Sequence, residues 1–410
     1  MIHPSAPISI AIEITHRCNN ACSGCANASN GRQIGDMCYW KDILDRVAPP
    51  ENRCKYLELL RITGGEPTLH DSFLPIIQYI DSFEIPHVLF TNGRWPDADG
   101  ILRVLGDCKH FMGLLISLHG ANADAHACFS SMGRDAFNET CATIQNAAGK
   151  GLTVFTNTVL NARNCNQIDE IIELSMHLGA ECAVFNRFLT HHHHLELSEE
   201  TLRDAIRRIE ELKAIGKGCR IGNCIPQCFI QNSSDGANAG FEHCTIAPDG
   251  AVRPDNLTRY LFGNVFNSSL EQIWRSVSAQ VYRDCIPNAC LTCGFLSRCR
   301  GGEKSLLIEY GLEKDPLMKT PLERSTAVSI DYDPESIPVP MYRFRKEKFG
   351  YLLVRYNWSI PFAFEAGPLI EAINGKNTIS DLEKNFGNTA LEVIAQLYEE
   401  NFIFVRTTEA

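Results

Sequence analysis

The sequence lacks any apolar run that approaches the roughly 18 residues needed to cross a bilayer. Its first five residues, MIHPS, begin neither the basic segment nor the long apolar run of a signal peptide. Positive charge is also scarce, because 38 Lys and Arg stand against 49 Asp and Glu and the net charge is -11. Binding to phosphates needs clustered positive charge, so this balance argues against a nucleic-acid partner. We therefore expect a cytoplasmic protein that binds neither membranes nor nucleic acids.

Cysteine, in contrast, is abundant, with 18 residues among 410. Without a secretion signal, so many cysteines favour metal sites over disulfides. Three of them, Cys18, Cys22 and Cys25, occupy one short loop with the spacing C-x3-C-x2-C after a strand-like run. Three thiolates can hold three irons of a 4Fe–4S cubane and leave the fourth iron open to a small molecule. The same residues also fit part of a structural zinc site, or buried free cysteines.

Strand-like and helical patterns alternate through the first half of the chain. In residues 8–15, isoleucines alternate with Ser, Ala, Glu and Thr, which is the period of a strand. Further strand-like runs cover 56–62, 87–91, 111–117, 152–158 and 181–186, and helical patterns cover 39–47, 71–83, 98–105, 135–148 and 166–178. Six strands alternating with helices predict an α/β fold of parallel βαβ units, two units short of a full barrel.

A second motif, Gly64-Gly65-Glu66-Pro67, follows the second strand-like run. Together with the cysteine loop it resembles the radical S-adenosylmethionine (SAM) superfamily. The resemblance implies an open partial (β/α)6 barrel over residues 1–190 and a 4Fe–4S cluster whose open iron chelates SAM. It also implies that Glu66 and the backbone of the motif line the methionine end of SAM. One departure is Gly24, which stands where the family usually has an aromatic residue.

Other strand ends supply further SAM contacts that the resemblance implies: Asn92, Ser117, Asn157 and Arg187. The alternative for Asn92-Gly93 is a plain turn, and the alternative for Asn157 is a cap on the following helix.

Over residues 219–310 the composition shifts to cysteine, glycine and short turns. An Asp-Gly hairpin follows Cys244, and Cys290-x2-Cys293-x5-Cys299 forms a second cysteine motif. These features resemble the SPASM extension of peptide-modifying radical SAM enzymes, which carries one or two auxiliary iron–sulfur clusters. The alternative is a structural zinc knuckle.

The match to SPASM is incomplete, because Asp255 and Glu303 stand where cysteines are expected and no cysteine follows Cys299. We therefore expect one auxiliary cluster, of the 4Fe–4S type, held by the three cysteines of the second motif. Its fourth ligand would be Cys285, Cys244, an oxygen ligand or nothing. Two clusters would require further ligands from Asp255, Glu303 or the pair Cys224 and Cys228.

Three segments complete the expected organisation. Residues 191–218 form a connecting loop and helix, in which His191–His194 are expected to be solvated. The proline-rich residues 311–340 form a linker. Residues 341–410 form a winged-helix-like α+β domain with strands at 342–344 and 351–356. This domain resembles the pyrroloquinoline-quinone chaperone fold, which implies that it binds a leader peptide as an added strand. A DNA-binding winged helix is the alternative, which the acidic balance disfavours.

For the reaction, the resemblance implies reductive cleavage of SAM to methionine and a 5′-deoxyadenosyl radical, with electrons from a flavodoxin- or ferredoxin-type donor. The radical would abstract hydrogen from a ribosomally made precursor peptide and lead to a cross-link such as a thioether or a C–C bond. The auxiliary cluster would take up an electron from the substrate radical or bind the substrate. The rival interpretations are a radical SAM maturase acting on a sulfatase or a tetrapyrrole, and a non-enzymatic iron–sulfur or zinc scaffold protein.

Overall fold

The computed structural model describes residues 3–27, 31, 33–50, 57–189, 193–323, 333–355 and 358–407. The chain divides into two compact units, a larger one over Ala6–Leu322 and a smaller one that combines Glu323–Ala410 with Met1–Ser5. None of the helices in the described ranges is long and apolar enough to cross a membrane.

The larger unit is built on one open sheet of ten strands in the order β10-β9-β8-β1-β2-β3-β4-β5-β6-β7. The strands from β8 to β7 in this order are parallel, and β9 and β10 add to the edge in antiparallel fashion. The strands are β1 (Ser9–Glu13), β2 (Leu59–Thr63), β3 (His87–Thr91), β4 (Phe111–Ser117), β5 (Val154–Leu160), β6 (Cys182–Arg187), β7 (Cys219–Ile221), β8 (His243–Ile246), β9 (Ala251–Arg253) and β10 (Gly263–Asn264). The six predicted strands are confirmed, although Tyr56, at the start of the second, lies outside the described residues.

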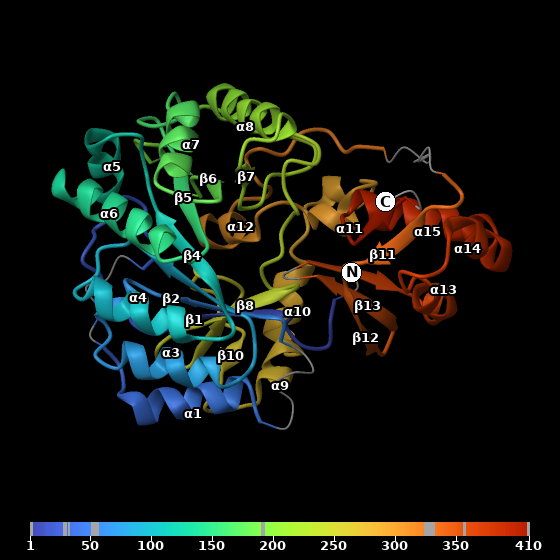
Figure 1. Cartoon of the computed structure of the whole chain (residues 1–410), viewed down its shortest axis with the longest axis horizontal. Coiled ribbons are helices and arrows are strands. Elements are labelled where there is room, and N and C mark those ends of the chain that lie inside the picture. Colours follow the sequence, from blue (N-terminus) through green and yellow to red (C-terminus); the bar gives the residue numbers. More distant parts are fainter. Residues whose placement is uncertain are drawn as a thin grey trace. The chain divides into compact units, whose positions relative to one another are not determined.

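Helices cover the outer side of this curved sheet (Figure 1). They are α1 (Met37–Val47), α3 (Phe73–Asp81), α4 (Ala98–Asp107), α5 (Ala123–Ser130), α6 (Asp135–Gly149), α7 (Ile168–His177) and α8 (Glu199–Ala214). All residues of β1 are buried, the polar Ser9 and Glu13 included. Burial on both faces is the usual state of a central parallel strand. The sequence pattern did not predict α5, a short helix whose N-cap Asn122 accepts a hydrogen bond from the backbone N–H of Ala125.

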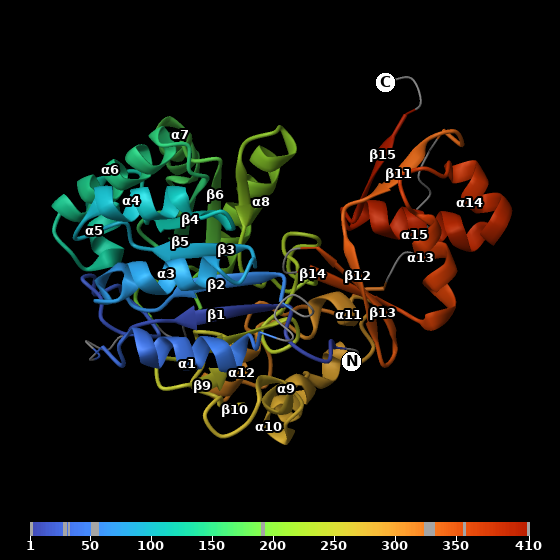
Figure 2. The ribbon, with the colours of Figure 1, turned by 60° about the horizontal axis from the view of Figure 1, so that its bottom comes forward.

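The cysteine-rich segment extends the barrel sheet, because β8 pairs in parallel with β1. The predicted hairpin is present as β8 and β9, and β8 thereby covers an edge of β1 that would otherwise expose unpaired backbone groups. Figure 2 shows β1, β2 and β3 side by side in this sheet. After the hairpin come α9 (Leu270–Trp274), α10 (Val277–Asp284), the 3-10 turn η2 (Asn288–Cys290), α11 (Leu296–Cys299) and α12 (Lys304–Tyr310).

The smaller unit contains a two-stranded sheet, a three-stranded sheet and three α-helices within its described residues. Its elements are β11 (Ile337–Pro340), β12 (Arg343–Glu347), β13 (Gly350–Arg355), β14 (Trp358–Phe362), η3 (Phe364–Ala366), α13 (Gly367–Ala372), α14 (Ile379–Phe386), α15 (Asn388–Glu399) and β15 (Ile403–Arg406). Its own apolar core includes Leu353, Ile370, Leu382, Ile394 and Phe402. Both strands expected near 342–356 are present, and Tyr356 lies outside the described residues.

The expected linker over 311–340 differs from the structure at its end, where β11 pairs with β15. Pro338 and Pro340 suggested a linker because proline donates no backbone hydrogen bond. Successive N–H groups of a strand point to opposite sides, however, so prolines at alternate positions leave Ile337 and Val339 free to pair. Residues 324–332 of the expected linker lie outside the described residues.

Candidate cofactor sites

A cavity of about 370 Å³ opens at the C-terminal ends of the barrel strands. It brings together most of the residues that the sequence singled out. Those lining it are Cys18, Cys22, Cys25, Gly64, Gly65, Asn92, Ser117 and Asn157. Sequence reasoning missed Asn256, which lines the same cavity from the loop after β9. No motif marks this asparagine, because only the pairing of β8 with β1 brings its loop to the cavity.

The two glycines of the GGEP motif hold the stem of the cysteine loop. The N–H of Gly65 donates to the carbonyl of Thr15 at 2.7 Å, and the N–H of Glu66 donates to the carbonyl of Arg17 at 2.7 Å. A Cβ atom would lie 2.3 Å from the Thr15 oxygen at Gly64 and 2.2 Å from the Arg17 oxygen at Gly65. Contacts this short are repulsive, so glycine is required here for the two backbones to approach. The second motif therefore fixes the backbone that leads into Cys18.

Further hydrogen bonds hold the cysteine loop itself. The backbone N–H of Ala21 donates to Ser130 at 3.2 Å, and that of Ser23 donates to Phe129 at 2.8 Å. Gly24, at φ 72°, adopts a left-handed conformation that an aromatic residue would adopt only with strain. The backbone conformation of the loop therefore favours glycine over an aromatic residue at position 24.

Asparagine and arginine side chains brace the same loop from the end of β3. Asn92 donates through Nδ2 to the Asn19 Oδ1 at 2.7 Å. Arg94 donates through Nη1 to the carbonyl of Asn19 at 2.7 Å and to the Asn20 side chain at 2.8 Å. Asn92 thus orients the loop as well as lining the cavity.

The three thiols are poor acids without a cation beside them. Burial, together with the charges of Cys25 and Cys18, raises the pKa of Cys22 to about 12. Burial also raises the pKa of Cys18 and of Cys25. Among the described residues that line the cavity, these thiols are the only groups that ionise in water. The donor set therefore fits a cationic iron cluster, which holds thiolates in their ionised form.

Glu66 is placed differently from the expectation that it lines the SAM site. Its side chain is fully buried and does not reach the cavity lining. The carboxylate accepts hydrogen bonds from the Thr68 hydroxyl at 2.7 Å, the Thr91 hydroxyl at 2.9 Å and the Asn92 N–H at 2.8 Å. Burial raises its pKa. Glu66 and Pro67, which begins the 3-10 turn η1 (Pro67–Leu69), thus join the end of β2 to the end of β3.

Arg187, another expected SAM contact, forms a buried ion pair with Asp315. Its Nη1 and Nη2 lie 2.9 and 2.5 Å from the two carboxylate oxygens, and both side chains are almost completely buried. Arg187 is absent from the cavity lining. The pair joins the end of β6 to the segment that follows α12.

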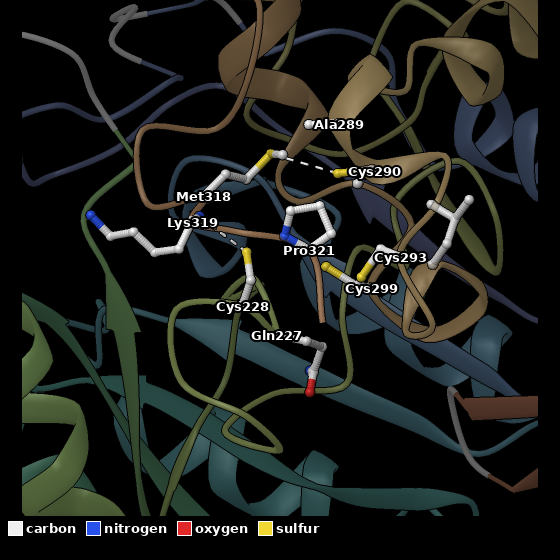
Figure 3. A pocket seen from close by; sticks show the side chains of 11 residues that line it. Gln227, Cys228, Ala289, Cys290, Cys293, Cys299, Met318, Lys319 and Pro321 are labelled. Atoms are coloured by element: carbon white, nitrogen blue, oxygen red, sulfur yellow. Dashed lines mark hydrogen bonds between the residues drawn. The ribbon is translucent and has the colours of Figure 1, made fainter. Parts of the chain in front are cut away.

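A second set of cysteines meets in a small enclosure of the SPASM-like region, shown in Figure 3. It is lined by Cys290, Cys293 and Cys299, as predicted, and also by Cys228. The N–H of Lys319 donates to the Cys228 Sγ at 3.2 Å. Burial and the charges of the other three cysteines raise the pKa of Cys290 to about 11. Four thiols around one enclosure match the ligand set of an iron–sulfur cluster.

Cys244 and Cys285, the fourth ligands suggested by the sequence, are not brought to this enclosure. Cys244 is fully buried in β8 within the main apolar core. Cys285 is the C-cap of α10, and its carbonyl accepts a hydrogen bond from Lys304 at 2.7 Å. Cys228 appeared in the sequence only as part of a pair for a second cluster. Cys228 is far from Cys290 along the chain, so no local spacing marks the two as ligands of one site. They meet because the loop after β7 folds back toward Cys290.

Asp255 and Glu303, which stand at expected cysteine positions, also lie outside this enclosure. Asp255 accepts hydrogen bonds at Oδ1 from the N–H groups of Leu257 and Thr258 at 2.8 and 2.9 Å. Burial and the charge of Glu303 raise its pKa to about 7. Glu303 accepts hydrogen bonds at Oε1 from the Ser305 N–H and hydroxyl. Both carboxylates therefore have structural partners of their own.

The run His191–His194 lies partly outside the described residues, since placement is described only for His193 and His194. Those two rings stack with centroids 4.4 Å apart.

Comparison with known proteins identifies two family models that match this chain. Residues 12–175 match the model of the Radical SAM superfamily, and residues 238–294 match that of the SPASM iron-sulfur cluster-binding domain. The mycofactocin maturase MftC of Mycobacterium ulcerans is 26% identical over 76% of this chain and 86% of its own length. The AdoMet-dependent heme synthase of Methanosarcina barkeri is 26% identical over 76% of this chain and 96% of its own.

Among solved structures, SuiB of Streptococcus suis bound to S-adenosylmethionine superposes with a TM-score of 0.63 at 16% identity, covering 76% of this chain and 77% of SuiB. SuiB has also been solved with its precursor peptide SuiA. At this identity the likeness establishes the fold, an open α/β barrel sheet. Cys228 and Cys299 fall outside the matched SPASM range, so their place in the enclosure comes from the structure of this chain.

Proposed function

The chain carries a radical SAM domain followed by a SPASM iron–sulfur cluster-binding domain, and from this premise we propose that it modifies a ribosomally made precursor peptide. The observation that carries the chemistry is the cavity at the strand ends, where Cys18, Cys22 and Cys25 meet neutral amides and backbone groups. The peptide substrate is supported by the likeness to MftC, which is named a maturase, and to SuiB, which has been solved with a precursor peptide.

The residues of the cavity suit SAM at its open end. Cys18, Cys22 and Cys25 would hold a 4Fe–4S cluster, which would supply one-electron cleavage of SAM to methionine and a hydrogen-abstracting 5′-deoxyadenosyl radical. Asn92, Asn157 and Ser117 present hydrogen-bonding groups that can orient a zwitterionic and ribose-bearing ligand. Asn157 is itself fixed, because its Oδ1 accepts a hydrogen bond from Asn186 at 2.5 Å.

For the second site we infer one auxiliary 4Fe–4S cluster held by Cys228, Cys290, Cys293 and Cys299. Four thiolates occupy all four irons of a cubane and leave none open to a substrate. The ligand set therefore favours electron transfer over substrate binding among the two roles expected from the sequence. The starting reduction needs a one-electron donor, for which we propose a flavodoxin- or ferredoxin-type protein.

For the smaller unit we propose capture of the leader segment of the peptide. In the described three-stranded sheet β12 is an edge strand whose strand neighbour is β13, and edge strands are the sites at which peptides add as a further strand. Tethering one end of a flexible peptide raises its effective concentration at the active site. The unit then acts by binding and takes no part in the radical chemistry.

Reductive SAM cleavage tests the proposed catalytic centre. In the anaerobically reconstituted protein we expect roughly eight irons per chain and release of 5′-deoxyadenosine with dithionite. Replacing Cys18, Cys22 and Cys25 by Ala should leave roughly four irons and abolish deoxyadenosine. A matched variant, Cys38→Ala/Cys128→Ala/Cys141→Ala, removes three described cysteines outside both sites and should behave as the wild type. Deoxyadenosine at the wild-type rate from the first variant would refute the assignment.

Peptide modification is tested by co-expression with short peptides encoded beside the gene, followed by mass spectrometry. A protein ending at Leu322 should keep both clusters and slow SAM cleavage, while modification of the full-length peptide falls strongly. Modification of a peptide without its leader should be equally slow with either protein. If a cluster-loaded truncation modifies the full peptide as well as the intact enzyme does, the leader-binding role is wrong.

A further inference from the structure

A cluster of three potential metal ligands lies at the opposite end of the barrel from the cysteine loop. It consists of Asp81, His87 and Cys108, each of which offers one ligand atom within 4.8 Å of the other two. Asp81 is the last residue of α3, His87 is the first residue of β3, and Cys108 directly follows α4. These positions are the N-terminal ends of parallel strands, whereas the cysteine loop follows the C-terminal end of β1. The reaction proposed above does not use any of the three.

The imidazole of His87 has the arrangement of a metal ligand. It is fully buried, and its Nδ1 lies 3.2 Å from the carbonyl of Ile85, to which it can only donate. In that tautomer Nε2 carries a lone pair, and within the described chain Nε2 is buried without a hydrogen-bond partner. A histidine that binds metal usually donates its other ring N–H to a backbone carbonyl or carboxylate. An acceptor nitrogen buried without a donor is otherwise unfavourable.

The other two groups are held in place by the backbone around them. The Asp81 carboxylate accepts hydrogen bonds from the N–H groups of Lys109 at 3.1 Å and His110 at 2.8 Å. The loop that carries Cys108 is thereby fastened to the end of α3. Each carboxylate oxygen has two lone pairs, so these bonds leave acceptor capacity. Burial, with the charges of Asp81 and Asp107, raises the pKa of Cys108 to about 11.

We propose that Asp81, His87 and Cys108 bind one zinc ion, with water in the fourth position. Thiolate, imidazole and carboxylate are the three ligand types that zinc takes from proteins. At Zn–S of about 2.3 Å and Zn–N of about 2.0 Å, tetrahedral ligands lie about 3.5 Å apart, so ligand atoms at the 4.8 Å limit of the observed cluster would move about 1.3 Å closer on binding. On binding, the Cys108 thiol transfers its proton to solvent and the sulfur becomes a thiolate ligand. The ion joins α3, β3 and α4, which are neighbours in Figure 2.

Zinc analysis of the holoenzyme tests the site, and iron loading serves as the internal standard. After anaerobic reconstitution and passage over a weak chelator, we expect about one zinc per chain in addition to full iron. Cys108→Ser and His87→Gln should each lower zinc at least tenfold while iron and SAM cleavage stay at wild-type levels. Cys141→Ser is the matched control, because Cys141 is also half-buried, burial raises its pKa to about 11, and it belongs to no such cluster among the described residues. It should retain the zinc.

X-ray absorption at the zinc edge distinguishes this site from zinc in an empty cluster site. The proposal requires one sulfur ligand, one imidazole and oxygen ligands, whereas a vacant cluster site would give three or four sulfurs. This measurement uses the wild type, so it remains decisive if a variant fails to fold. Wild-type protein without zinc, a sulfur-only spectrum, or zinc retained by both Cys108→Ser and His87→Gln would overturn the proposal. If the wild type holds no zinc, a buried water that donates to His87 Nε2 would occupy the site instead.

Discussion

Replacing Gly65 by Ala tests whether the GGEP motif acts by positioning the cysteine loop. The new Cβ would lie 2.2 Å from the Arg17 oxygen and 2.7 Å from its carbonyl carbon, and both are backbone atoms that cannot rotate away. To reach 3.0 Å from that oxygen, the two segments must separate by about 0.8 Å. The neighbouring hydrogen bonds, at 2.7 Å, would then exceed the normal range. Losing two backbone hydrogen bonds destabilises the site by about 2 kcal/mol.

The larger effect should be on chemistry, since a shift of about 1 Å in a reacting group can lower the rate about 100-fold. We expect the Gly65→Ala protein to lose most iron from the first site, to retain the roughly four auxiliary irons, and to release deoxyadenosine about 100-fold more slowly. Gly106→Ala is the control, because Gly106 lies in α4 with no atom within 4 Å of the added Cβ. It should be neutral or stabilise by up to about 1 kcal/mol. Iron content and anaerobic SAM turnover measure both variants, and a fully loaded, fully active Gly65→Ala protein would refute the reasoning.

Two further predictions concern the second site and its surroundings. Cys228→Ala should make the auxiliary cluster labile, so that the iron content falls from roughly eight toward four per chain on chelator treatment. Cys285→Ala should keep all of its iron. The reverse result would restore Cys285 as the fourth ligand. Asp255→Asn keeps an Oδ1 acceptor for Leu257 and Thr258 but cannot ionise. Because burial raises the Asp255 pKa to about 7, the wild type is stabilised at low pH and loses that stability as pH rises through 7. Between pH 6 and pH 8 it should lose about 1 kcal/mol more than Asp255→Asn. Anaerobic thermal unfolding at the two pH values measures this, and equal losses would show that Asp255 does not titrate there.

The parts of the site that the sequence predicted are those encoded by residues close together in the chain. The cysteine loop follows its own strand, and Gly64-Gly65 follows the next, so parallel pairing alone brings them to one edge. Asn92, Ser117 and Asn157 end neighbouring strands and meet in the cavity for the same reason.

The rest depended on contacts between distant segments, which local patterns do not contain. Cys228 reaches the auxiliary cysteines because the loop after β7 folds against them, and Asn256 reaches the cavity because β8 pairs with β1. Arg187 has the position of a cofactor contact in the sequence, but a carboxylate more than a hundred residues later, Asp315, binds it. The cluster of Asp81, His87 and Cys108 has no motif spacing at all, since it assembles from two helix ends and a strand start.

The pairing of β1 with β8 also sets the order in which the chain can fold during synthesis. Ser9 leaves the ribosome long before its partner His243, and at about 5–20 residues per second the delay is on the order of ten seconds or more. Throughout that interval β1, a strand that is buried along its whole length in the folded protein, has one edge without a partner, which is the arrangement that promotes aggregation. A nascent chain stalled before residue 243 should therefore bind chaperones strongly, and release should follow once β8 emerges. The sheet that carries the cysteine loop therefore stays incomplete until β8 has been synthesised.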